Sequence, residues 1–152
     1  MNFLIVYPKH PVKFWDLESL LKYFSGMANF PPVVLLKIAS LLPREWNKKL
    51  IVMNEKDIRD EDILWADYVF ISAIPDQSKS ATKIIDRCKK LNIKTVASGS
   101  LFTTNDDYYK KVDHLVFDET EITLPQFLND LSEGKPKQKY SSKIYPNITP
   151  AY

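Results

Sequence analysis

Five short runs of apolar residues recur along the chain, and β-branched and aromatic side chains are frequent in them. They occupy residues 3–7, 50–53, 68–72, 95–98 and 114–117. Most of these runs are continuously apolar and do not alternate with polar positions. Continuous apolar strands are typical of sheets covered on both faces, which are usually parallel. The pattern therefore predicts five buried parallel strands.

The segments between the runs have apolar residues at helical spacing. In residues 78–91, for example, Ile84, Ile85 and Cys88 fall on one face and lysines fall on the other. The predicted helices cover residues 15–24, 32–42, 60–65, 78–91, 104–110 and 120–131.

Alternating strands and helices predict an α/β fold. We expect a doubly wound five-stranded parallel sheet with helices on both faces. Right-handed crossovers favour the strand order 2-1-3-4-5, which is flavodoxin-like, or Rossmann-like in the broad sense.

The length of 152 residues and the 45% hydrophobic content suit a single core. After Gly134 the periodicity ends and proline, lysine and serine become frequent. We therefore expect one domain over residues 1–134 and an extended tail or linker over residues 135–152.

The charge balance restricts the possible partners. A formal charge of +2, with 21 basic and 19 acidic residues, gives no reason to expect nucleic-acid binding. The apolar stretches are too short or interrupted to span a bilayer, so a cytoplasmic protein is expected. The single cysteine, Cys88, excludes an internal disulfide framework. With only His10 and His114 as histidines, a self-contained structural metal site is not expected.

Ligands of open α/β sheets bind beyond the carboxyl ends of the strands. Here the residues after the first strand are Pro8-Lys9-His10-Pro11, and the whole chain has three glycines. A dinucleotide or P-loop site needs glycines there, because the backbone must approach the phosphates closely. These nucleotide sites are therefore excluded at this edge.

Two turns at the same edge are ambiguous. Gly99, after the fourth strand, allows a close approach of backbone to a ligand, or belongs to a tight turn capped by Ser100 or Thr103. Ser72, which ends the third strand, either binds a ligand or caps the next helix.

Several motifs extend over almost the whole chain in a fixed order. They are Phe30-Pro31-Pro32 with residues 35–43, Asp60-Glu61-Asp62 with residues 65–73, residues 101–104, Val112-Asp113-His114, Glu119-Thr120-Glu121, Leu124-Pro125, Phe127-Leu128 and Gly134-Lys135-Pro136. In this order they resemble the cobalamin-binding N-terminal domain of class B (cobalamin-dependent) radical S-adenosylmethionine enzymes, most closely the hopanoid methylase group.

The resemblance implies a metal-binding cofactor, cobalamin, held over the carboxyl edge, and a radical S-adenosylmethionine barrel as partner in cis or in trans. The methylases of this family transfer a methyl group. The cofactor-binding residues it implies are Tyr7, Pro8, His10, Ser72, Ala73, Ile74, Gln77, Ser98, Gly99, Ser100, Leu101, Phe102, Asp118, Glu119 and Thr120.

The chain departs from the family pattern in four ways. The histidine motif for a lower cobalt ligand is missing, and His10 is a weak substitute because it is more often a plain loop residue. Ser98 stands in place of the first glycine of a pair and Ser100 in place of proline, and Asp118 occupies a usual glycine position. The three-cysteine motif is absent, so no iron-sulfur cluster and no cleavage of S-adenosylmethionine are expected from this chain alone.

The leading hypothesis is a cobalamin-binding module of a radical S-adenosylmethionine methyltransferase-type protein, non-catalytic by itself. The alternative is a free-standing interaction or regulatory domain that has lost cobalamin binding. Whether the chain is an excised domain or a free-standing relative stays open. An independent hydrolase or transferase has little support, because Asp60-Glu61-Asp62 and Asp106-Asp107 fit surface charge at helix starts.

Overall fold

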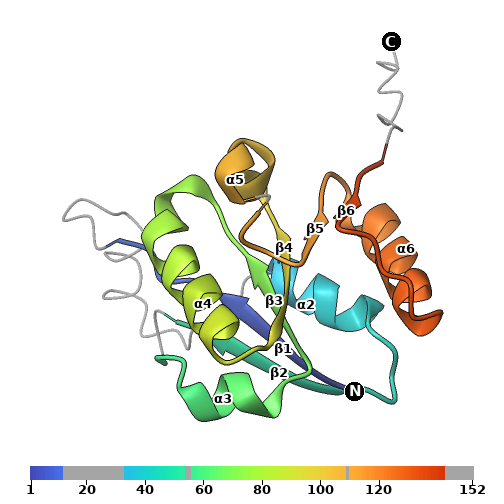
Figure 1. Ribbon diagram of the computed structural model, residues 1–152, viewed down its shortest axis with the longest axis horizontal. Coiled ribbons are helices and arrows are strands. Elements are labelled where there is room, and N and C mark those ends of the chain that lie inside the picture. The colour runs from blue at the N-terminus through green and yellow to red at the C-terminus, as the bar shows by residue number, and fades with distance from the viewer. Residues whose placement is uncertain (12–32, 54–55, 109, 143–152) are drawn as a thin grey trace.

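A parallel sheet of six strands, in the order β2-β1-β3-β4-β5-β6, forms the centre of the protein (Figure 1). The computed structural model describes residues 1–11, 33–53, 56–108 and 110–142. The strands are β1 (Asn2–Tyr7), β2 (Asn47–Val52), β3 (Tyr68–Ser72), β4 (Lys94–Ser98), β5 (His114–Val116) and β6 (Lys139–Tyr140). The helices are α2 (Val33–Leu41), α3 (Asp60–Trp65), α4 (Ser78–Lys90), α5 (Ser100–Thr103) and α6 (Thr120–Ser132), with 3-10 turns η1 (Pro75–Gln77) and η2 (Asp106–Tyr108).

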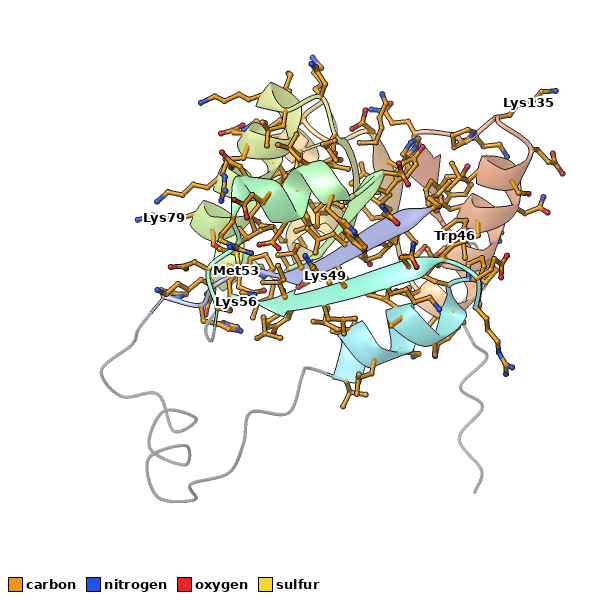
Figure 2. The ribbon with its side chains drawn as sticks, turned by 90° about the horizontal axis from the view of Figure 1, so that it is seen from below. Trp46, Lys49, Met53, Lys56, Lys79 and Lys135 are labelled. Carbon is orange, nitrogen blue, oxygen red and sulfur yellow. The ribbon has the colours of Figure 1, made fainter. Side chains whose placement is uncertain are left out.

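The helices cover both faces of the sheet (Figure 2). On one face, α3, α4 and α5 pack against residues such as Val69 and Ile71 of β3. On the other, α2 and α6 pack against residues such as Phe70. The strands are apolar on both sides because each face meets its own helical layer. The predicted α/β class and the order of the first five strands are therefore confirmed.

The strand count predicted from the sequence is wrong by one, because β6 pairs with β5 inside the expected extended tail. Tyr140 explains this pairing. Its ring packs 5.6 Å from that of Phe127, and its hydroxyl donates to Asp130 Oδ2 and accepts the Lys137 amide N–H. A strand of two residues has no periodicity, so the apolar pattern does not reveal it.

Strand β2 begins at Asn47, three residues before the predicted run of 50–53. It lies at the edge of the sheet, where its polar first half stays partly exposed while its backbone pairs with β1. The predicted helix 104–110 is also wrong, since α5 ends at Thr103 and the 3-10 turn η2 (Asp106–Tyr108) follows it. Burial of Leu101 and Phe102 favours the earlier start, and the Asn105 side chain then accepts the Asp107 N–H, which competes with a continuous helix.

Asp62, predicted as surface charge, is buried at the start of α3. Its carboxylate accepts the Lys49 ammonium at 2.8 Å and the Arg59 backbone N–H at 3.1 Å. The predicted helix 15–24 lies outside the described residues. Among the helices that the structure describes, none has the length and apolar character that crossing a membrane requires.

Candidate functional site

The turns after β3 and β4 interlock at the carboxyl edge of the sheet. The Ala73 N–H donates to Ser98 O, and the Leu101 N–H donates to Ala73 O, each at 3.1 Å. Between them, Gly99 has φ of +101°, and a Cβ there would lie 2.3 Å from Ala73 O. The close approach of the Ala73 backbone therefore requires glycine at position 99, so a tight turn accounts for this residue without a ligand. Gly99 itself occupies the N-cap position of α5, and neither Ser100 nor Thr103 caps it.

Ser72 and Ser98 are partners in the register of β3 and β4, each with 5% of its surface exposed. By strand alternation both side chains belong to the face of Phe70 and Val96, beneath α2 and α6. Ser72 does not cap a helix, because the N-cap of α4 is Gln77. Neither serine hydroxyl has a hydrogen-bond partner in the described chain.

The described residues contain no fully buried side-chain oxygen or nitrogen without a hydrogen-bond partner. The two unpaired hydroxyl oxygens must therefore each retain a small exposed surface. Two adjacent hydroxyls in this position can donate to and accept from a ligand.

The fully buried Gln77 links the loop after β1 to the turn after β3. Its Oε1 accepts the Ile74 N–H at 2.9 Å, and its Nε2 donates to Pro8 O at 2.6 Å. The same Nε2 lies 3.3 Å from His10 Nε2, which is also 3.2 Å from the Tyr7 hydroxyl. An amide nitrogen only donates, so His10 Nε2 acts as the acceptor. This nitrogen of His10 is therefore engaged within the protein.

A second group of predicted residues lies on the opposite face of the sheet. Phe102 and Asp118 line a cavity of about 180 Å³ together with Thr103, Asn105, Leu115, Phe117, Lys139 and Ser141. This is smaller than the roughly 300–1,000 Å³ of typical ligand pockets. Beside it, Glu119 is the N-cap of α6, Thr120 is its first residue, and Ser100 is exposed.

Asp118 has a left-handed backbone, with φ of +62°. The resemblance implies that glycine is usual at this position, and glycine adopts the left-handed region freely. Aspartate is among the few other residues that also adopt it. The Asp118 carboxylate accepts the Ser142 N–H at 3.0 Å. Aspartate in place of glycine therefore adds a negative charge at the edge, and the backbone conformation is one that glycine would also adopt.

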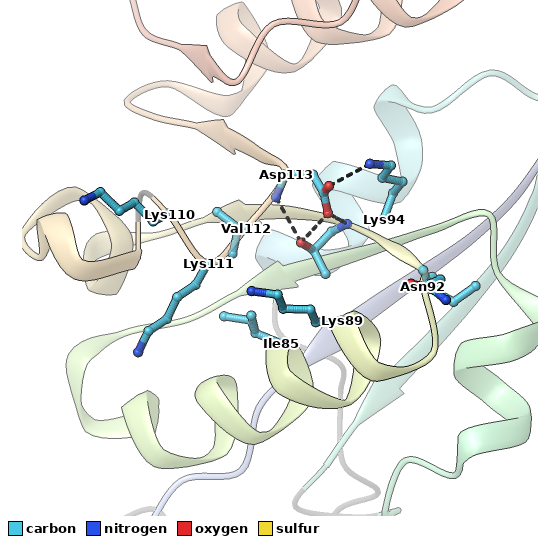
Figure 3. Close-up of a pocket in the computed structure, with 10 residues that line it drawn as sticks. Ile85, Lys89, Asn92, Lys94, Lys110, Lys111, Val112 and Asp113 are labelled. Carbon is cyan, nitrogen blue, oxygen red and sulfur yellow. Dashed lines mark hydrogen bonds and ion pairs between the residues drawn. The ribbon is translucent and has the colours of Figure 1, made fainter.

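Sequence reasoning missed a larger cavity, of about 370 Å³, between α4 and the segment that precedes β5 (Figure 3). It lies toward the amino ends of β4 and β5, away from the predicted site. In the part of the chain that the structure covers, no group of three or more His, Cys, Asp or Glu residues could hold a metal ion. The lining of the large cavity is instead rich in lysine.

Two curated proteins align with nearly the whole chain. An uncharacterized methyltransferase from Synechocystis sp. is 32% identical over 152 residues, which is 98% of this chain and 28% of the relative. A hopanoid C-2 methylase from Rhodopseudomonas palustris is 26% identical over 158 aligned positions, 98% of this chain and 30% of the relative. No family model matches the chain.

These comparisons relate the chain to methyltransferase-type proteins, which agrees with the expected association with methylases. The chain spans less than a third of the length of either relative.

Proposed function

We propose that this chain is a cobalamin-binding module of a radical S-adenosylmethionine methyltransferase-type protein, with no catalysis of its own. The observation that supports this most directly is the pair of nearly buried, unpaired hydroxyls of Ser72 and Ser98 at the carboxyl edge. Burying a polar group without a partner has a cost, so such groups are usually hydrogen-bonded. A bound polar ligand would satisfy both.

The residues at this edge fit the proposed cofactor chemically. Ser72 and Ser98 would hydrogen-bond its polar groups, and the bonds between the turns after β3 and β4 would hold these residues in place. When bound, cobalamin supplies a cobalt centre that accepts and donates a methyl group. The chain itself would bind and orient the cofactor, and the remaining part of a longer protein, or a partner barrel, would supply the reaction.

Titration with hydroxocobalamin tests this proposal. We expect the corrin absorption bands to shift on addition of the 152-residue chain and to saturate. The double variant Ser72→Ala/Ser98→Ala should weaken binding at least about tenfold, in proportion to two lost hydrogen bonds of about 1 kcal/mol each. Ser132→Ala, which removes an exposed hydroxyl bonded within α6, is the matched control and should bind as the parent does.

The stability of the double variant separates binding from folding. Because neither hydroxyl has a protein partner, replacing both by alanine should leave the free energy of unfolding within about 0.5 kcal/mol of the parent. An unchanged corrin spectrum at excess parent protein would refute the proposal. Binding by the double variant at full affinity would refute the role of the serines.

The second candidate is an interaction or regulatory domain without cobalamin, favoured by the charge of Asp118 at the edge. If the charge and bulk at the edge caused the loss, Ser98→Gly/Asp118→Gly should create hydroxocobalamin binding that the parent lacks. The left-handed backbone of Asp118 makes glycine acceptable at that position. If neither the parent nor this variant binds hydroxocobalamin, Ser98 and Asp118 are not the cause of the missing binding.

A further inference from the structure

The cavity of about 370 Å³ has a strongly basic lining. Four of its ten residues are lysines, namely Lys89, Lys94, Lys110 and Lys111, and Asp113 is its single carboxylate. The volume lies within the range of small-molecule sites, roughly 300–1,000 Å³.

The carboxylate of Asp113 is already saturated by protein groups. Its Oδ1 accepts the Lys94 ammonium at 2.9 Å, and its Oδ2 accepts the Thr95 N–H and hydroxyl at 2.9 and 3.1 Å. Burial alone would raise the pKa of Asp113, but the hydrogen bonds and the Lys94 charge outweigh burial and hold the pKa below its ordinary value. The carboxyl is therefore ionised and paired. The charge left uncompensated is therefore positive.

Lys89, Lys110 and Lys111 have no carboxylate partner among the residues that the structure describes. Lys111 lies over the Tyr108 ring, 5.6 Å from its centroid. Figure 3 shows Lys89 on α4 and Lys111 on the segment before β5, with Ile85 and Val112 between these elements. Ile85 and Val112 are 1% and 4% exposed, so they close the cavity between the basic side chains, and a ligand reaches little of their surface.

Both walls of the cavity are held in place without a ligand. The bonds among Thr95 and Asp113 fix the segment before β5 to the start of β4. At the end of α4, the N–H groups of Asn92 and Ile93 donate to Lys89 O and Cys88 O, so these carbonyls are not directed unpaired at the cavity. A preformed site binds with a smaller entropy cost than one that must be assembled.

We propose that this cavity binds a small organic phosphate with two or more negative charges, such as a nucleoside diphosphate. Its phosphates pair with Lys89 and Lys111, and its less polar part contacts the methylene stems of the lining lysines. Lysine ammonium groups replace the glycine-rich loop that most nucleotide sites use, so the scarcity of glycine does not exclude this site. The low net charge of the chain favours a small ligand over nucleic acid, which requires an extended basic surface.

Calorimetric titration of the 152-residue chain with ADP tests the proposal. We expect saturable binding of one ADP, and binding of pyrophosphate that is at least about tenfold weaker because it lacks the part that contacts the lysine stems. Lys89→Gln/Lys111→Gln should weaken ADP binding about tenfold or more. The matched control is Lys79→Gln/Lys83→Gln, which removes the same charge from α4 outside the cavity and should change the affinity less than twofold.

Three results would overturn the proposal. They are absence of saturable ADP binding at millimolar concentration, equal weakening by the two double variants, and tighter binding of an oligonucleotide than of ADP. Pyrophosphate binding as tightly as ADP would overturn the organic part of the assignment. The variants replace exposed side chains, so circular dichroism should confirm that they fold. This site is separate from the one proposed for cobalamin, and ADP should leave the hydroxocobalamin titration unchanged.

Discussion

Replacing Gly99 by alanine should destabilise the protein more than the same replacement at Gly134, the other glycine of the described chain. The new Cβ would lie 2.3 Å from Ala73 O and 3.0 Å from Ala73 N. Both contacts are to backbone, so no side-chain rotation relieves them. The backbone of Gly99 also combines φ of +101° with ψ of 168°, a region that only glycine adopts readily.

Two costs add up in this variant. Holding alanine in the glycine-only region costs about 1–3 kcal/mol. Separating the two turns to relieve the clash weakens the bonds from Ala73 N to Ser98 O and from Leu101 N to Ala73 O, at about 1 kcal/mol each. We expect a total loss of about 3–5 kcal/mol, which is a large part of the roughly 5–15 kcal/mol that stabilises a typical domain.

Urea denaturation of Gly99→Ala and Gly134→Ala measures this difference. Gly134 also has a positive φ, +72°, but an added Cβ meets nothing within 4 Å. This control should lose only about 1 kcal/mol, from the left-handed backbone alone. A loss in Gly99→Ala that matches the control within about 0.5 kcal/mol would show that the two turns do not interlock as described.

Other predictions concern groups away from that edge. The Lys49 hydrogen bond holds the pKa of Asp62 below its ordinary value, so Asp62 contributes stability above about pH 4 that is lost as the pH falls through its native pKa. In Asp62→Asn, the free energy of unfolding measured with urea should therefore decline less steeply below about pH 5. A decline as steep as that of the parent would contradict the pairing. Burial raises the pKa of Cys88 to about 12, so its thiol should react with a disulfide reagent at pH 8 only as fast as the protein unfolds. A rapid reaction of the folded protein would contradict the burial of this thiol. Tyr140→Phe removes a hydroxyl that donates to Asp130 and should cost about 1–2 kcal/mol in thermal or urea unfolding. Tyr68→Phe, whose hydroxyl makes no hydrogen bond within the described chain, should lose less.

The sheet could be predicted because each of its first five strands leaves a sequence signal. Continuous apolar runs such as 68–72 indicate burial on both faces, and the order follows from crossover handedness. Strand β6 depends on the single side chain of Tyr140 reaching Phe127 and Asp130, which belong to the preceding helix α6. Tertiary contacts of this kind leave no periodic pattern.

The candidate site could be located but not resolved into roles. Strand ends placed Ser72 and Ser98 at one edge, yet their shared face and unpaired hydroxyls required the register of β3 and β4. Gln77 reads from sequence as an edge residue, whereas its amide bonds two loops that are far apart in the chain. The lysine-rich cavity combines residues of α4 and the segment before β5, and no local motif joins them.

The arrangement of the edge restricts the size of a ligand that uses all of it. Strand alternation assigns Ser72 and Ser98 to the face of α2 and α6, while Phe102 and Asp118 line a cavity against the opposite apolar layer. A ligand that contacts both groups must extend across the strand ends. A small metabolite would reach one group only. If one ligand contacts both groups, it must therefore be large, as the cofactor proposed for the edge is.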